Sequence, residues 1–94
     1  MHLAVMMIEL HLPGCQSLKQ KRSRLKPLLI RLHREFNVST AEIDYHDVLQ
    51  STLIACAAVS NDAAHLQRLL KPIPGWIERT RPDLQTVDHQ VDLY

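Results

Sequence analysis

The chain has 94 residues and a net charge of +1, with 46% hydrophobic and 22% charged residues, two glycines and two cysteines. This length suffices for one core that needs no metal or disulfide, and the composition excludes a disordered or low-complexity chain. We therefore expect a single folded domain over residues 1–94.

The small net charge hides a strong division along the chain. Seven basic residues and no acidic residue lie between Leu10 and Arg34, whereas the rest of the chain holds four basic residues and all ten acidic ones. One segment thus carries +7 and the remainder −6. Such a basic block indicates either an anion-binding face or the solvated side of a helix, and composition leaves both alternatives open.

Residues 2–12 alternate as a β-strand that is apolar on both faces in its first half. The segment has no basic start, meets Glu9 early and offers no small-residue cleavage site, so it predicts a strand and not a signal peptide. No later apolar stretch approaches the ~20 residues that span a bilayer. We expect a cytoplasmic protein in which Cys15 and Cys56 are free thiols.

Pro13-Gly14 ends this strand, and Ser17 is a candidate N-cap for the helix that follows. Leucines then recur at helical spacing and form one apolar stripe, which ends near Asn37. Pro27 falls inside this helix, where proline loses a backbone hydrogen bond and clashes with the preceding turn. Two alternatives follow: a kinked helix that starts at Ser17, or a separate turn before a regular helix that starts near Ser23.

The second half of the chain predicts three more strands and a second helix. The strands are expected at about 38–45, 49–59 and 84–93, and the helix from Ala63 to about Leu70, after the cap residues Ser60-Asn61-Asp62. Two prolines and a glycine interrupt that helix at Lys71–Gly75 and leave a final turn at Trp76–Arg79.

The resulting order, β-α-β-β-α-β, is that of the α+β ferredoxin-like fold, a two-layer sandwich with a four-stranded antiparallel sheet and two helices on one face. The first and third strands are central in this fold, and here they are the most apolar. Because the other face of the sheet has no helix, its apolar residues need a cover. We expect a homodimer or a protein partner across the sheet.

Several motifs, in order and spread over nearly the whole chain, carry a family resemblance. They are Glu9–Pro13, Ser17–Arg22, Phe36–Ser39, Ala41-Glu42 and Val59–Asp62. In these motifs the chain resembles the YlxP-like bacterial family of small ferredoxin-like proteins of unknown function. The resemblance implies a bacterial cytoplasmic protein. Members are often encoded beside transcription-termination, translation-initiation and ribosome-maturation factors, which implies RNA or the ribosome as a partner.

Basic residues at the start of the first helix are the strongest candidates for a binding site. Cations there oppose the helix dipole, so their placement needs another reason. Backbone N–H groups, a serine hydroxyl and several cations together suit a phosphate. The candidate nucleic-acid or anion-binding residues are Ser17, Lys19, Lys21, Arg22, Arg24 and Lys26. The alternative is a solvated basic face, which is how we interpret Arg31 and Arg34.

Other chemistries fit the sequence less well. The six histidines show no ligand spacing, the two glycines make no phosphate loop, and Ser60-Asn61-Asp62 suits helix capping. We expect no catalytic residue, no metal site and no cofactor. The central strands also lack the aromatic side chains that stack on RNA bases, so any RNA contact goes through phosphates.

The sequence therefore supports three hypotheses. The first is a non-enzymatic accessory protein that binds RNA or the ribosomal phosphate backbone through the first helix. The second is a homodimeric or protein–protein interaction module that uses the apolar open face of the sheet. The third is an enzyme or small-anion binder that uses the loop Gly14–Ser17.

Overall fold

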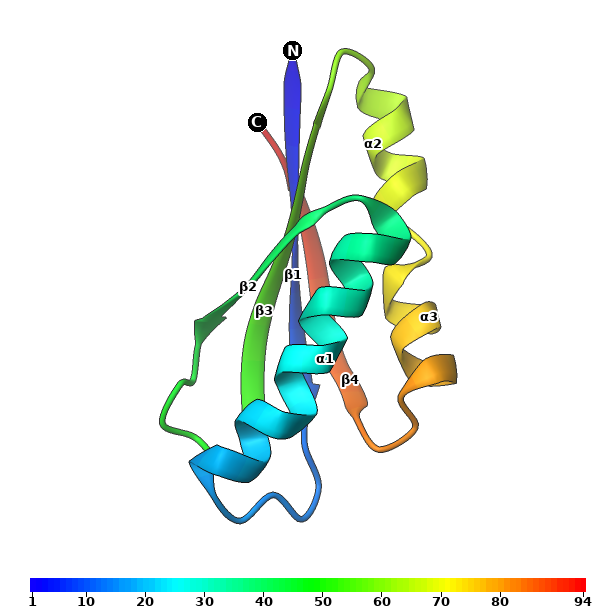
Figure 1. Cartoon of the computed structure of the whole chain (residues 1–94). Helices are drawn as coiled ribbons and strands as arrows, with labels where there is room; N and C mark the ends of the chain where they lie inside the picture. Colours follow the sequence, from blue (N-terminus) through cyan, green and yellow to red (C-terminus); the bar gives the residue numbers. More distant parts are fainter.

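The computed structural model describes all 94 residues (Figure 1). The elements are β1 (His2–His11), α1 (Leu18–Phe36), β2 (Ser39–Asp44), β3 (Ser51–Ser60), α2 (Ala63–Leu70), α3 (Ile73–Thr80) and β4 (Gln85–Leu93). The strands form one antiparallel sheet in the order β2-β3-β1-β4, and the helices cover one of its faces. This confirms the ferredoxin-like two-layer sandwich, with β1 and β3 at its centre.

Alternation along β1 decides which side chains form the core. Successive strand residues point to opposite faces of a sheet. The even-numbered residues from Ala4 to Leu10 are buried under the helices, whereas the odd-numbered residues beside them are only partly buried. β3 follows in register, because Met6 pairs with Cys56 and Ile8 with Ile54. The helix-facing side of the sheet is therefore continuous across its two central strands.

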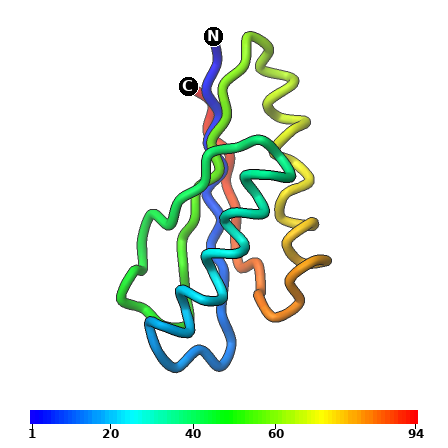
Figure 2. The backbone as a smooth tube through the Cα atoms, in the orientation of Figure 1, coloured from blue at the N-terminus to red at the C-terminus, as the bar shows by residue number.

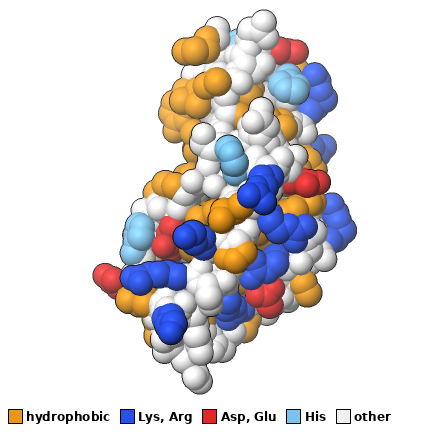
Figure 3. All heavy atoms as spheres, in the orientation of Figure 1, with side chains coloured by type: hydrophobic (Ala, Val, Ile, Leu, Met, Phe, Trp, Pro, Cys, Tyr) orange, Lys and Arg blue, Asp and Glu red, His pale blue; other side chains and the backbone are white.

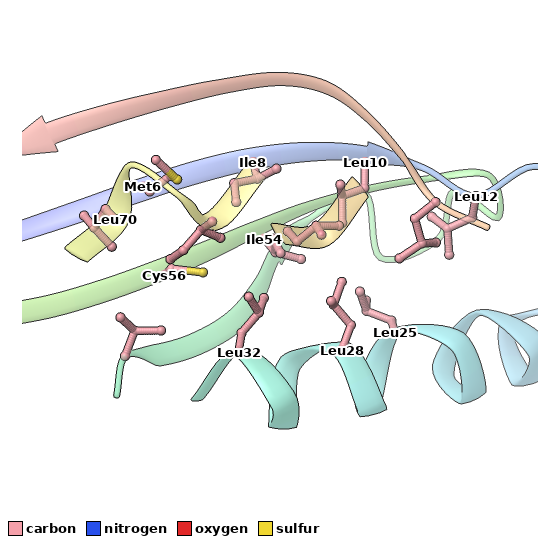
Figure 4. Packing of buried hydrophobic residues seen from close by; sticks show 14 of the residues in the cluster. Met6, Ile8, Leu10, Leu12, Leu25, Leu28, Leu32, Ile54, Cys56 and Leu70 are labelled. Carbon is pink, nitrogen blue, oxygen red and sulfur yellow. The ribbon is translucent and has the colours of Figure 1, made fainter. Parts of the chain in front are cut away.

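The helices supply the other half of the core. Figure 4 shows Leu25, Leu28 and Leu32 of α1 pointing at the sheet, and Leu70 of α2 beside Met6. Each of these five side chains is at most 5% exposed. Fully burying a leucine contributes roughly 1.5–3 kcal/mol. This leucine stripe holds α1 against the sheet and fixes which of its faces looks outward.

α1 runs without interruption from its N-cap Ser17 to Phe36, and Asn37 ends it in the left-handed conformation with φ of 53°. Of the two alternatives for its start, the helix that begins at Ser17 is confirmed. Pro27 lies inside the helix on its exposed side. Its ring nitrogen has no hydrogen to donate to the carbonyl of Ser23, and that residue is also exposed, so water can satisfy the free oxygen.

The segment after α2 differs from the expected final turn at Trp76–Arg79. It forms a separate two-turn helix, α3, in which Ile73 and Ile77 are fully buried. Pro72 and Pro74 lie at its N-terminus, where the missing N–H would have no helical partner in any case. The prolines therefore end α2 and begin α3, and the second helix of the fold is split in two.

α3 also contacts the end of α1. The rings of Phe36 and Trp76 meet edge to face, with centroids 5.4 Å apart. The guanidinium of Arg31 lies 5.1 Å from the centroid of the Trp76 ring, which orients that arginine on the surface of α1. None of the helices has the length and the apolar character needed to cross a membrane.

Candidate functional site

Five exposed cations line one side of α1. Lys19, Arg22 and Lys26 are three and four residues apart, which places them on the same helix face. With Arg31 and Arg34 they border one shallow surface depression, which no acidic residue borders. Figure 3 shows Lys and Arg side chains gathered over the part of the surface where α1 lies. We call these five residues the α1 basic stripe.

Lys21 points the other way and is 3% exposed. Its Nζ donates to the carbonyls of Tyr45 at 2.6 Å and Val48 at 2.7 Å, and lies 3.0 Å from Oε2 of Glu42. A lysine ammonium has three N–H donors, and all three have acceptors here. Lys21 therefore has a structural role in place of the expected anion contact: it fastens the β2–β3 loop to the first turn of α1 (Figure 2).

Glu42 completes this buried network from β2. Its Oε2 accepts a hydrogen bond of 2.6 Å from the hydroxyl of Thr52, which is fully buried on β3. Burial alone would raise the pKa of Glu42, but the hydrogen bonds from Thr52 and Lys21 and the lysine charge hold that pKa below its ordinary value. The carboxylate is therefore ionised at neutral pH and balances the buried ammonium.

Arg24 is also engaged within the protein. Its guanidinium donates to the carbonyl of Pro13 at 2.8 Å and to that of Asp83 at 2.6 Å. Arg81 donates to the carbonyl of Arg24 at 2.9 Å and pairs with the Asp83 carboxylate at 2.9 Å. The hydrogen bond from Arg81 is the main reason that the pKa of Asp83 lies below its ordinary value. Arg24 thus joins α1 to two loops, the one between β1 and α1 that contains Pro13 and the one between α3 and β4 that contains Asp83.

The start of α1 is closed by its own side chains. The hydroxyl of Ser17 accepts from the backbone N–H of Gln20 at 3.1 Å, and the Gln20 side chain accepts from the N–H of Gln16 at 2.8 Å. This is the reciprocal arrangement of a capping box, shifted by one residue at its return bond. Ser17 therefore acts as the helix cap, and the N–H of Gln20 is not free for a phosphate.

The six residues singled out in the sequence separate into two groups. Three of them, Lys19, Arg22 and Lys26, share the α1 basic stripe. The other three, Ser17, Lys21 and Arg24, hold the fold together. Arg31 and Arg34, which the sequence analysis interprets as part of a solvated face, are exposed and border the same depression.

The two cysteines are free thiols, as expected, and both are buried. Burial raises the pKa of Cys56 to about 12, so its thiol stays protonated and unreactive at neutral pH. The thiol of Cys15 donates a hydrogen bond to the carbonyl of Ser17, with 3.6 Å between sulfur and oxygen. No three His, Cys, Asp or Glu side chains are grouped as a metal ion would require.

The face of the sheet opposite the helices is a second candidate surface. β1 contributes Leu3, Val5 and Met7 to it, and the register places Ala57 and Ala55 of β3 beside the last two. These side chains are small or aliphatic, and neither central strand contains a phenylalanine, tyrosine or tryptophan. The surface therefore lacks the stacking platform that RNA-binding sheets of this architecture use. We call it the open sheet face.

Comparison with known proteins agrees with the motifs of the sequence. Residues 3–91 match the family model described as a protein of unknown function, DUF503. The chain is also similar to the uncharacterized protein YlxP of Bacillus subtilis strain 168, with 40% identity over 62 residues, which cover 66% of this chain and 67% of that protein. The family-model match includes the whole of α1 and β3 and all of β1 except His2. The chain belongs to the DUF503 family of proteins of unknown function.

Proposed function

We propose that this protein is a non-enzymatic accessory protein that binds the phosphate backbone of RNA, in particular ribosomal RNA, through the α1 basic stripe. One observation carries the proposal: five exposed cations border a single depression that no acidic residue borders. Solubility alone does not require cations to be separated from acidic residues, because a surface with both charges interspersed is also soluble. A surface of one sign attracts polyanions and speeds their encounter with the protein.

The dimensions of the stripe fit a nucleic-acid strand. From Lys19 to Arg34 a helix rises by about 22 Å. In double-stranded DNA the phosphates of one strand follow each other every ~3.4 Å along the axis, so a stripe of this length is long enough to reach several phosphates of a nucleic-acid strand. Pro27 and Ile30 lie between the cations and add no charge. The stripe can therefore contact several consecutive phosphates from one rigid element.

The contact proposed is one of backbone recognition. Cations that meet phosphates fix position and supply affinity, whereas base edges and stacking supply sequence information. Neither central strand offers a phenylalanine, tyrosine or tryptophan ring for stacking. The expected binding is therefore weakly dependent on RNA sequence and strongly dependent on salt.

The experiment is fluorescence anisotropy with a labelled ribosomal RNA fragment. We expect the variant Lys19→Glu/Arg22→Glu/Lys26→Glu to bind at least a hundredfold more weakly than the wild type. The matched control, Arg68→Glu/Lys71→Glu/Arg79→Glu, makes the same change in net charge at exposed positions on α2, its C-cap and α3. Equal affinities for the two triple variants would show that net charge alone matters and would overturn the proposal.

A second function is proposed for the open sheet face, as a contact surface for a second copy of the chain or for another protein. It is favoured by the apolar residues that no helix covers, among which Val59 is 65% exposed. Exposed apolar patches on one face commonly mark such contacts. Sedimentation velocity over a range of concentrations distinguishes a dimer from a monomer that awaits a partner.

A further inference from the structure

We infer that the open sheet face binds a basic and apolar segment of another protein, and not a second copy of this chain. The inference rests on the second function proposed above and adds the chemistry of the partner. It does not depend on RNA binding by α1, which uses the opposite layer of the molecule.

The centre of the open sheet face is formed by apolar side chains. Its side chains come from alternate positions of β1 and β3, which the register brings together in pairs. They are Leu3, Val5, Met7, Leu53, Ala55, Ala57 and Val59. Small residues along the middle of β3 permit close approach of another chain. An apolar strip of this kind is a typical centre for a protein contact.

Acidic residues border this strip. The register places Asp88 of β4 beside Glu9 and Asp92 beside Val5, while Asp44 of β2 lies beside Leu53 at the other edge. No strand of the sheet contains a lysine or an arginine, because all eleven of these residues lie in helices or loops. The open sheet face is therefore negative, in contrast to the positive outer surface of α1.

This charge pattern disfavours a face-to-face dimer of the chain. In a twofold dimer the same patch meets itself, so every contact on the face is made between two copies of one surface. Acidic residues at both edges would then meet acidic or neutral residues, whichever way the twofold axis ran. Because the strands contain no lysine or arginine, the sheet of the second copy would bring neither of these cations to them.

A hollow at the edge of the strip indicates which kind of side chain the partner inserts there. It has a volume of about 200 Å³ and is lined by Met7, Glu9, Leu53, Asp88, His89 and Gln90. Glu9 has no cation partner in the chain, and the Asp88 carboxylate accepts only from the N–H of His89, at 2.9 Å. A long basic side chain fits this chemistry, since its methylene stem can lie on the apolar residues while its charge meets the two carboxylates.

The α1 basic stripe of a second copy is also a poor match for the open sheet face. Among the residues that border the α1 basic stripe, the only large aliphatic side chain is Ile30. The open sheet face offers a long apolar strip with acidic residues at its border, so a matching surface needs apolar and basic side chains on the same side. An extended segment of another protein can present both on one side, because side chains two residues apart point in the same direction.

The test uses the full chain with methyl-labelled methionine and two synthetic octapeptide probes. The basic probe repeats leucine-serine-arginine-serine, which places leucine and arginine on one side when the peptide is extended, and the acidic probe has glutamate in place of arginine. Met7 reports on the open sheet face, whereas Met6 lies on the opposite side of β1 and is 2% exposed. We expect the basic peptide to shift the Met7 methyl resonance in a saturable way and to leave Met6 nearly unchanged. The acidic peptide should shift neither.

Two double variants complete the test. Glu9→Gln/Asp88→Asn removes the carboxylates of the hollow and should weaken the basic peptide at least tenfold. Glu35→Gln/Glu78→Gln removes two exposed acidic groups from α1 and α3 and should leave affinity unchanged. Equal loss in both variants, or no Met7 shift, would overturn the inference. A Met7 shift that follows protein concentration alone would also overturn it, while supporting a dimer through the same face.

Discussion

Cations on the two sides of α1 differ in their surroundings, although they lie close together in the sequence. Lys19, Arg22 and Lys26 are exposed and border one surface, whereas Lys21 is buried and Arg24 donates to carbonyls of two loops. The difference explains why cations gather at the positive end of a helix dipole. Lys21 and Arg24 offset the unfavourable position with contacts inside the protein, and the proposed phosphate contact is the reason that we give for the exposed cations.

The largest effect is expected from Lys21→Met, which keeps the length of the side chain and removes its charge. The substitution leaves the carbonyls of Tyr45 and Val48 and the carboxylate of Glu42 without a donor. Breaking a buried ion pair from one side typically lowers the free energy of unfolding by about 3 kcal/mol. Urea denaturation measures it, and Lys19→Met serves as the control, with a change below about 0.5 kcal/mol. Similar losses in both would contradict the division between the two sides.

A smaller and pH-dependent effect is expected from Glu42→Gln. Because the pKa of Glu42 in the folded protein lies below its ordinary value of 4.5, the folded state binds fewer protons than the unfolded state at acidic pH. The stability that this carboxylate contributes is therefore complete above pH 4.5 and is lost as the pH falls through the lower, folded-state value. Urea denaturation from pH 7 to pH 3 should show the wild type approaching the variant. A gap that stays constant over this range would contradict the assignment.

The smallest effect on stability among these is expected from Ser17→Ala. Loss of an N-cap costs about 1 kcal/mol. If Ser17 is only a cap, the variant should unfold at lower urea concentration but bind a ribosomal RNA fragment with unchanged affinity under conditions where it is folded. A tenfold loss of RNA affinity in the folded variant would return this serine to the binding site.

Much of this arrangement could be predicted from the sequence because it depends on local periodicity. The period of two along β1 and the leucine spacing of α1 gave the correct fold, the correct central strands and the correct inner faces. Even the inward direction of Lys21 could be predicted from helical spacing, since it lies four residues before Leu25. Its partners could not be predicted in this way, because Tyr45 and Val48 are distant in the sequence and only the fold brings them to Lys21.

The sequence does not predict the start of α3, for a different reason. Two prolines and a glycine indicate the end of a helix, although proline is equally suited to a first turn. What decides between these outcomes is the burial of Ile73 and Ile77 against the sheet, which a local pattern does not report. Similarly, the acidic border of the open sheet face comes from three strands, and only their register brings Glu9 and Asp88 together.

The salt dependence of RNA binding tests the role of the α1 basic stripe most directly. For single-stranded RNA each neutralised phosphate contributes about −0.7 to the slope of log K against log salt concentration, so five contacts predict a slope of about −3.5. The Lys19→Glu/Arg22→Glu/Lys26→Glu variant should retain a slope of about −1.4 at most. Parallel slopes for the wild type and this variant would contradict a phosphate contact by the outward side of α1.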